Sequence, residues 1–299
     1  MLDAASAGGA VTTLLIAALR NGLIDAALVI GRDPERPWIP QARLVDSEQQ
    51  IIDCAQASYC ITPNLQLLAD TTHQRVGLAA LPCQVEAIEK MRALSQRPAV
   101  ADKIALTIEI ACSSNTRRTG TEHLITERLG LPLTSTADMR YRSGQYPGDF
   151  TVTDSGGTRH TVPFHELVLT FKQFKTFRCK ACPDWWSGVA DLSVADGDPN
   201  IFRTSRNSET KPKTSLLVTR TDRGNALVDL AMRQGLLEAL PGDFDPETNL
   251  GLQRKHHRYL RHRERHPNAV PTPPMDVDRQ LAPLQDDEVI ERLSPGRSD

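Results

Sequence analysis

The chain has 299 residues, of which 39% are hydrophobic and 24% charged. Its 35 Lys and Arg against 37 Asp and Glu give a net charge of −2, which argues against nucleic acid or a membrane surface as partner. No apolar run approaches the roughly 18 residues of a membrane span, and the N-terminus lacks a signal-peptide pattern. We therefore expect a cytoplasmic protein without a membrane span. Six cysteines in such a protein are typical of metal ligands or catalytic thiols rather than disulfides.

The first part of the chain is predicted to alternate helices and strands. Apolar residues recur at helical spacing over 11–19, residues 26–30 form a short apolar run typical of a buried strand, and residues 41–45 are predicted as a second strand. The small residues at 6–9 precede the first helix, where free backbone N–H groups favour an anion such as a phosphate or a flavin pyrophosphate. The alternative interpretation is a helix start whose small residues allow close packing.

Two cysteines follow short apolar runs that are typical of strands. Residues 75–81 are followed by Cys83 and a helix over 84–91, and residues 103–110 are followed by Cys112. Ligands bind at the carboxyl ends of strands in open α/β sheets, and successive strands are often neighbours. We therefore expect the two thiols to lie close together. We also expect a lowered pKa for Cys83, because it lies near a helix N-terminus.

Turn residues and apolar periodicity predict the elements of the second half of the chain. A hairpin is expected over 149–163 around a Ser-Gly-Gly turn, whereas residues 139–148 indicate a loop and residues 199–213 a polar, mobile segment. The other predictions are helices over 118–129, 164–174, 225–232 and 253–266, a strand before the turn at Asp196-Gly197, and a strand over 215–220. The helix over 253–266 is dense in Arg and His, which indicates a solvated basic surface.

The most specific chemical signal is Cys179-Lys180-Ala181-Cys182, which is the only Cys-x-x-Cys in the chain. With Cys83 and Cys112 it supplies four thiols from three separated places. Four thiolates suit either structural zinc or an iron–sulfur cluster. Structural zinc usually takes two close pairs of ligands, and only one pair is close here, so the spacing favours a cluster and leaves zinc open. Cys54 and Cys60 are predicted to be small core residues.

Several short blocks occur in the order that is found in one protein family. They are Ser6-Ala7-Gly8-Gly9 with Leu23-Ile24-Asp25, Leu81-Pro82-Cys83-Gln84, Ala111-Cys112-Ser113, Tyr146-Pro147-Gly148, Cys179-Lys180-Ala181-Cys182-Pro183-Asp184 with Ala190-Asp191-Leu192-Ser193, and Arg220-Thr221-Asp222-Arg223-Gly224. This ordered set, which extends over about residues 5–240, resembles the coenzyme F420 hydrogenase/dehydrogenase beta-subunit family. That family includes ferredoxin-linked reductases such as 7-hydroxymethyl chlorophyll a reductase.

The resemblance implies an α/β fold with a mixed-sheet core and an iron–sulfur cluster held by loops at strand ends. It implies FAD and a [4Fe–4S] cluster as cofactors. The implied cluster ligands are Cys83, Cys112, Cys179 and Cys182, and the expected FAD contacts are Ser6, Gly8, Gly9, Thr12 and Asn115. No residue is singled out as a catalytic proton donor. Ala7 stands where the family commonly has serine, so a member that has lost FAD is a further alternative.

The implied function is that of an oxidoreductase or oxidoreductase subunit. It would pass electrons between ferredoxin or a hydrogenase/dehydrogenase partner and coenzyme F420 or a similar organic acceptor, and a homo-oligomer is compatible with the sequence. We expect an FAD-associated region over 1–75, a region with the cluster cysteines over 76–242, and a basic helix with a disordered tail over 243–299. The alternatives are a ferredoxin-dependent reductase of a tetrapyrrole-like or other conjugated substrate, and a zinc-stabilised, non-catalytic binding module.

Overall fold

A computed structural model describes residues 5–94, 99–242 and 250–268. Its central sheet contains the strands β1 (Ala26–Arg32), β2 (Pro40–Val45), β3 (Val76–Ala80), β4 (Ile104–Ile110), β8 (Leu192–Asp196) and β9 (Ser215–Thr219). Within the described ranges the strand order is β2-β1-β3-β4-β8-β9. The four middle strands are parallel, and the edge strands β2 and β9 run antiparallel to their neighbours. This arrangement confirms the predicted α/β fold with a mixed sheet.

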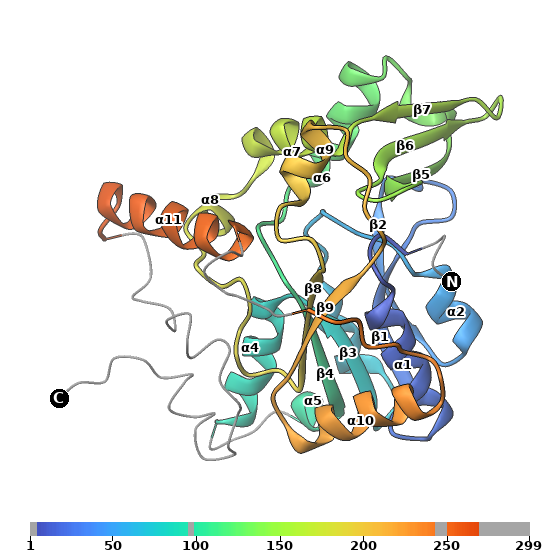
Figure 1. Cartoon of the computed structure of the whole chain (residues 1–299), viewed down its shortest axis with the longest axis vertical. Helices are drawn as coiled ribbons and strands as arrows, with labels where there is room; N and C mark the ends of the chain where they lie inside the picture. Colours follow the sequence, from blue (N-terminus) through green and yellow to red (C-terminus); the bar gives the residue numbers. More distant parts are fainter. Residues whose placement is uncertain (1–4, 95–98, 243–249, 269–299) are drawn as a thin grey trace.

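Helices cover both faces of the central sheet (Figure 1). They are α1 (Ala10–Arg20), α2 (Glu48–Asp53), α4 (Pro82–Arg92), α5 (Ala99–Asp102) and α10 (Asp222–Arg233). The apolar sides of α1 and α10 pack on one face, and α4 covers the other. The start of α4 is fixed by Gln84, whose side chain accepts a hydrogen bond from the Leu81 N–H at 2.9 Å. The chain therefore turns directly from the carboxyl end of β3 into α4.

A smaller antiparallel sheet lies beyond one end of the central sheet (Figure 1). Its elements and neighbouring helices are β5 (Thr136–Ser143), β6 (Asp149–Asp154), β7 (Arg159–Val162), α6 (Arg118–His123), α7 (Phe164–Phe171) and α9 (Ile201–Arg206). The hairpin between β6 and β7 confirms the prediction, and Asp154 Oδ1 accepts hydrogen bonds at 2.9 Å from the N–H groups of Gly156 and Thr158. Buried Tyr141 and Phe150 belong to a separate apolar core beside this sheet.

Two segments that the sequence indicates as irregular form regular structure. Residues 139–148 are predicted as a loop, but β5 extends to Ser143 and pairs with β6. Residues 199–213 are predicted as a polar, mobile segment, but α9 occupies part of this range. The carboxylate of Asp198 holds this segment, because it accepts a hydrogen bond from Lys211 Nζ at 3.0 Å. The loop prediction was wrong for residues 139–143, which belong to β5, and the prediction of an irregular segment was wrong for the residues of α9.

The remaining elements are short, apart from the last helix. They are α3 (Leu67–Asp70), α8 (Phe177–Lys180), α11 (Leu250–Arg265), 3₁₀ turns over Asn64–Gln66, Leu133–Ser135 and Lys172–Phe174, and a π-helical turn over Leu124–Arg128. The basic helix predicted over 253–266 is confirmed as α11. Most of the predicted tail lies outside the described residues. No described helix is long and apolar enough to cross a membrane.

Candidate functional site

A cavity of about 1360 Å³ lies at the carboxyl ends of β3 and β4. Its walls come from the segment that precedes α1, the loops after both strands, α7, α8 and the start of α11. Carboxyl ends of parallel strands are the common ligand-binding edge of α/β sheets. The volume exceeds the roughly 300–1,000 Å³ of usual small-molecule sites, so the cavity has room for a dinucleotide.

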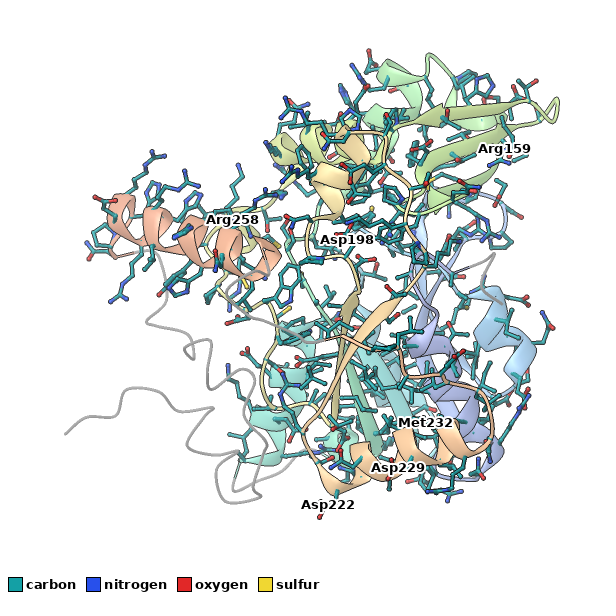
Figure 2. All side chains as sticks on the ribbon, in the orientation of Figure 1. Arg159, Asp198, Asp222, Asp229, Met232 and Arg258 are labelled. Atoms are coloured by element: carbon teal, nitrogen blue, oxygen red, sulfur yellow. The ribbon has the colours of Figure 1, made fainter. Side chains whose placement is uncertain are left out.

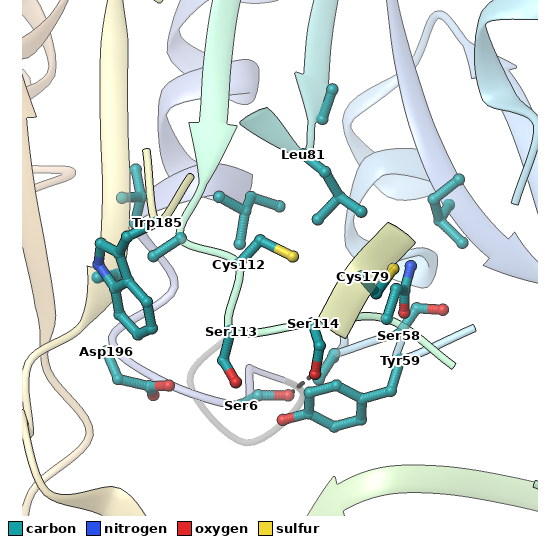
Figure 3. A pocket seen from close by; sticks show the side chains of 18 of the residues that line it. Ser6, Ser58, Tyr59, Leu81, Cys112, Ser113, Ser114, Cys179, Trp185 and Asp196 are labelled. Atoms are coloured by element: carbon teal, nitrogen blue, oxygen red, sulfur yellow. Dashed lines mark hydrogen bonds between the residues drawn. The ribbon is translucent and has the colours of Figure 1, made fainter. Parts of the chain in front are cut away.

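All four predicted cluster cysteines line this cavity. Cys83 is the second residue of α4, Cys112 follows the end of β4, Cys179 lies in α8, and Cys182 follows α8. Because β3 and β4 are parallel neighbours, the expected closeness of their two end loops is confirmed. The Cys112 N–H donates to the Trp185 carbonyl at 3.0 Å, which ties the loop after β4 to the chain that follows the Cys-x-x-Cys. Figure 3 shows Cys112 between Trp185 and Cys179, with its sulfur turned toward the Cys179 side.

The chain between Cys182 and β8 is fixed by two buried carboxylates. Asp191 accepts hydrogen bonds from the backbone N–H and the hydroxyl of Thr107 at 2.9 and 3.0 Å. Glu109 accepts a hydrogen bond from the Ser187 N–H at 2.6 Å. Both acceptors therefore hold this chain against β4, because Thr107 and Glu109 belong to that strand. These buried hydrogen bonds fix the position of the chain that follows the Cys-x-x-Cys relative to β4, which leads to Cys112.

Desolvation raises the pKa of three of these thiols. It raises the pKa of Cys182 to about 12 and that of Cys112 above its ordinary value. Cys83 keeps an exposed surface at the cavity, but desolvation by the surrounding atoms, with a smaller effect of Cys112, raises its pKa to about 11. The prediction of a lowered pKa for Cys83 was wrong, because loss of water around the sulfur outweighs the helix N-terminus. Binding of a metal centre would therefore release protons from these thiols.

A buried lysine that the sequence analysis missed lies among the thiols. Lys255 of α11 is 2% exposed, and its Nζ donates hydrogen bonds to the carbonyls of Cys112 and Asp184. Its positive charge opposes the effect of burial, because it lowers the pKa of Cys83, Cys112 and Cys182. The prediction of a merely solvated basic helix was therefore wrong for this face of α11. In the sequence, the high density of basic residues in that helix is the one feature that could have pointed to Lys255.

The chemistry of the four thiols suits a thiolate-bound metal centre. The described residues contain no group of three or more His, Cys, Asp or Glu side chains arranged to hold a metal ion. The four thiols nevertheless line one cavity and influence one another electrostatically. Thiols gathered from three segments around a space suit a four-iron cluster, whereas structural zinc usually takes closely spaced ligand pairs.

The predicted FAD contacts at the start of α1 divide into two groups. Ser6, Gly9 and Thr12 line the cavity. Gly9 has a φ of +79°, and no side chain caps the helix, so the first N–H groups of α1 are available to an anion. Gly8 is not part of the lining, and a Cβ at this position would lie 2.7 Å from the backbone N of Ser215. Its visible role is therefore close packing against the start of β9.

Asn115 lines the cavity, but its side chain already has a backbone partner. Asn115 Nδ2 donates to the Cys60 carbonyl at 3.0 Å, so it orders the loop that follows Cys112. The Cys60 sulfur lies 3.1 Å from the Tyr141 hydroxyl in the core of the small sheet. Cys60 and Cys54 are 3% and 7% exposed, which confirms that both are core residues.

Unpaired polar groups around the cavity indicate a polar ligand. Buried polar atoms of native proteins are nearly always hydrogen-bonded. Among the residues that the structure describes, six buried polar atoms of the lining have no partner. They are Gln56 Oε1, Ser58 Oγ, Arg142 Nη2, Trp185 Nε1, Asn200 Oδ1 and Arg258 Nε. A ligand with phosphate, hydroxyl and amide groups would satisfy such atoms, so the cavity fits a flavin dinucleotide.

Arg142 is the most buried cation of the wall formed by the small sheet. It is 6% exposed, its Nη1 lies 3.0 Å from Asp196 Oδ1, and its Nε donates to the Pro147 carbonyl at 2.7 Å. The guanidinium also lies over the rings of Tyr146 and Phe164, at 5.2 and 5.4 Å from their centroids. The Tyr146-Pro147-Gly148 block was the only sequence signal in this region, and it did not identify the arginine.

Comparisons with known proteins agree with this arrangement. The family models for the coenzyme F420 hydrogenase/dehydrogenase beta subunit match residues 1–69 for the N-terminal part and 73–243 for the C-terminal part. The coenzyme F420 hydrogenase subunit beta of Methanothermobacter thermautotrophicus is 29% identical, and the match covers 83% of this chain and 82% of that protein. The chloroplastic 7-hydroxymethyl chlorophyll a reductase of Oryza sativa subsp. japonica is 24% identical, over 78% of this chain and 47% of the reductase.

The fold is also found in a solved structure. A chain of the F420-reducing [NiFe] hydrogenase complex from Methanosarcina barkeri superposes with a TM-score of 0.68 at 23% sequence identity, and the match covers 88% of this chain and 86% of that chain. The two parts of the family model together extend over the sheet, the four predicted cluster cysteines and all of the cavity lining except the residues of α11. The chain therefore belongs to the coenzyme F420 hydrogenase/dehydrogenase beta-subunit family.

Proposed function

We propose that this chain is an oxidoreductase subunit that binds a [4Fe–4S] cluster and FAD. It exchanges electrons between a redox partner protein and coenzyme F420 or a similar organic acceptor. Family membership supports the reaction class, since the relative from Methanothermobacter thermautotrophicus is named as a coenzyme F420 hydrogenase subunit. The proposed partner is ferredoxin or a hydrogenase or dehydrogenase subunit, and the hydrogenase complex that shares the fold supports such an assembly.

One observation carries this proposal: a thiol donor set and unpaired polar atoms share one cavity. Cys83, Cys112, Cys179 and Cys182 supply the thiols, and the six unpaired atoms come from other segments of the lining. A metal centre and an organic cofactor that occupy one cavity lie close enough to exchange electrons. A zinc-stabilised binding module would explain the thiols alone and would leave the unpaired atoms without a ligand.

The cysteines and Lys255 act together in the proposed site. The thiolates of Cys83, Cys112, Cys179 and Cys182 would hold the cluster, which supplies one-electron chemistry when bound. Lys255 fixes two loops of this site through the carbonyls of Cys112 and Asp184. Its buried ammonium offsets part of the negative charge that four thiolates place in this cavity.

The opposite side of the cavity would bind and orient the organic cofactor. The first N–H groups of α1 and the unpaired Nη2 of Arg142 are donors for anionic groups. Asp196 holds the guanidinium of Arg142 in place through Nη1, which leaves Nη2 for a ligand. When bound, FAD supplies the conversion between one-electron and hydride chemistry. The protein's contribution is to orient it and to exclude water around it.

The test is an anaerobic assay of the reconstituted full chain. Reduced methyl viologen serves as electron donor and oxidised coenzyme F420 as acceptor, and loss of F420 absorbance is followed with time. We expect turnover by the wild type and by a Cys54→Ala control, because Cys54 is a core residue at the edge of the cavity and is not one of the four proposed ligands. Cys112→Ala and Cys179→Ala should abolish turnover. Reduction of 7-hydroxymethyl chlorophyll a without reduction of F420 would support the tetrapyrrole reductase instead. A colourless zinc protein without either activity would contradict the proposal.

A further inference from the structure

The helix α11 carries a concentration of positive charge that the rest of the chain lacks. Over Leu250–Arg265 it has five arginines, one lysine and one glutamate, while the whole chain has a net charge of −2. It begins after the last residue that the family models match. Figure 2 shows its side chains projecting from the side of the molecule opposite Arg159. This helix therefore lies beyond the part of the chain that the family models match.

One face of α11 packs on the cysteine segment. Leu252, Lys255 and Tyr259 recur at helical spacing and are 3%, 2% and 1% exposed. Tyr259 packs against Ala181 between the two cysteines of the Cys-x-x-Cys. Farther along the helix, the ring of His266 lies 5.4 Å from that of Phe177. This face of α11 therefore packs against α8 and the residues that follow it.

The other faces of α11 are exposed and basic. The exposed arginines are Arg254, Arg261, Arg263 and Arg265. Between these and the docked face, Arg258 Nη2 donates to the carbonyls of Ser113 and Cys179, the latter at 3.4 Å. Positive charge therefore extends from the solvent to the backbone of two loops that carry proposed cluster ligands. Phe177 and Leu260 are 44% and 45% exposed and add apolar area to the same region.

We propose that this basic face of α11 and α8 is the docking surface for an acidic protein that carries a one-electron redox centre. The inference rests on the proposed function, since it assigns the place where electrons enter or leave. Electron-transfer complexes have small, transient interfaces, and complementary charge raises the rate of encounter. A partner docked here would lie against α8 and Cys179, which gives the short path that electron transfer requires.

The proposed exchange involves two single electrons and one proton for each acceptor molecule. Each encounter moves one electron from the reduced partner to this chain, so the partner's centre is oxidised by one electron. Two encounters supply the electron pair, which an organic acceptor takes up with one proton as a hydride equivalent. In the opposite direction the same surface delivers single electrons to the oxidised partner. Release between encounters has to be fast, and it is favoured by exposed charges that salt screens.

The experiment measures reduction of the reconstituted holoprotein by an acidic plant-type ferredoxin in stopped flow, over a range of ionic strength. The test variant neutralises three exposed arginines at the outer end of α11, namely Arg261→Gln, Arg263→Gln and Arg265→Gln combined. A matched control neutralises three exposed arginines elsewhere, namely Arg159→Gln, Arg206→Gln and Arg233→Gln combined. Sodium dithionite, a small reductant that needs no protein docking, reports whether the redox centres are intact in every variant.

We expect the α11 variant to be reduced by ferredoxin roughly tenfold more slowly than the wild type at low ionic strength. The difference should vanish at high salt, because screening removes the attraction. The control variant should behave as the wild type, and dithionite should reduce all three proteins equally. Such a result supports the docking surface, and full cofactor content with dithionite reduction keeps the proposed function separate from it.

Three outcomes would overturn the docking surface. The first is equal slowing in the α11 and control variants, which would indicate an effect of overall charge. The second is no reduction of the wild type by ferredoxin although dithionite reduces it, which would leave the proposed cofactors intact and remove the acidic partner. The third is binding of a labelled RNA or DNA duplex that is lost in the α11 variant while the ferredoxin rate is unchanged. That result would assign the basic face to nucleic acid.

Discussion

Two buried cations place positive charge in the wall of the cavity, and neither could be predicted from the sequence. Lys255 and Arg142 are 2% and 6% exposed, and they reach the cavity from α11 and β5. A lone lysine or arginine in a polar stretch carries no periodic signal. The cysteines could be predicted because a Cys-x-x-Cys is rare by chance and Cys83 and Cys112 follow two readable strands. The residues that complete the thiol site thus became visible only through tertiary contacts.

Lys175 leads to a prediction about pH. It lines the cavity, and desolvation, with the nearby Arg258 as a smaller effect, lowers its pKa to about 8. Its ammonium is therefore present below that pH and lost as the pH rises through it. We expect the affinity of the apo-protein for FAD to fall between roughly pH 7 and 9, by at most about tenfold per pH unit for one proton. Titration calorimetry with FAD at several pH values measures this change.

Two substitutions separate the charge of Lys175 from its shape. Lys175→Arg keeps a positive charge throughout this range, because arginine stays protonated. That variant should bind FAD with little dependence on pH. Lys175→Met should bind more weakly at the lower pH and should also lose the pH dependence. A Lys175→Met protein with the wild-type affinity and the wild-type pH profile would show that the ammonium does not act on the ligand.

At the scale of elements, the start of α1 depends on packing as much as on ligand chemistry. A Cβ on Gly8 would lie 2.7 Å from the Ser215 N and 2.8 Å from the Thr214 carbonyl carbon. We therefore expect Gly8→Ala to push β9 away from α1 and to lower the free energy of unfolding by about 1–3 kcal/mol. Urea denaturation of the apo-protein, without any cofactor, measures this loss.

A matched control for Gly8 is Gly242→Ala, because a Cβ at Gly242 would meet no atom of the described residues within 4 Å. That substitution should leave the stability unchanged or raise it by up to about 1 kcal/mol. The packing interpretation would be wrong if Gly8→Ala kept the wild-type stability and lost only its affinity for FAD. In that case Gly8 would contact the ligand, as the family resemblance implies.

The elements that could be predicted are those whose signal is local. The turn between β6 and β7 could be predicted from the turn residues Ser155-Gly156-Gly157 alone. Asp154 stabilises it by accepting hydrogen bonds from the N–H groups of Gly156 and Thr158. β5 was missed because it contains charged residues, and its Arg142 is buried among distant partners that include Asp196 and the ring of Phe164. Long-range pairing of this kind cannot be read from the strand itself.

At the scale of the whole molecule, the topology of the sheet brings the thiols together. β3 and β4 are successive parallel strands, so the meeting of Cys83 and Cys112 could be expected from their order in the chain. The pairing of β8 with β4 could not be expected from the sequence. In the chain, 81 residues separate the end of β4 from the start of β8, from Ala111 to Asp191. The strands of the small sheet lie in that interval. After them the chain passes through the Cys-x-x-Cys segment and then forms β8 beside β4.

The mixed sheet crosses the boundary that was predicted between the regions 1–75 and 76–242. The strands β1 and β2 precede residue 75, yet they belong to the same sheet as β3, β4, β8 and β9. The proposed FAD region over 1–75 and the proposed cluster region over 76–242 therefore contribute to one cavity. Hydrophobic periodicity identifies strands one at a time, and it does not report which strands pair across such a distance.

The cofactor content of the anaerobically reconstituted full chain decides whether the cavity holds a cluster and a flavin. Iron, acid-labile sulfide, zinc and flavin are quantified per chain together with the visible spectrum. We expect about four irons and four sulfides, the content of one cubane cluster, with about one FAD per chain. We also expect that Cys112→Ala and Cys179→Ala lose the iron while Cys54→Ala keeps it. About one zinc per chain, with no iron and no flavin absorbance, would contradict the proposed function.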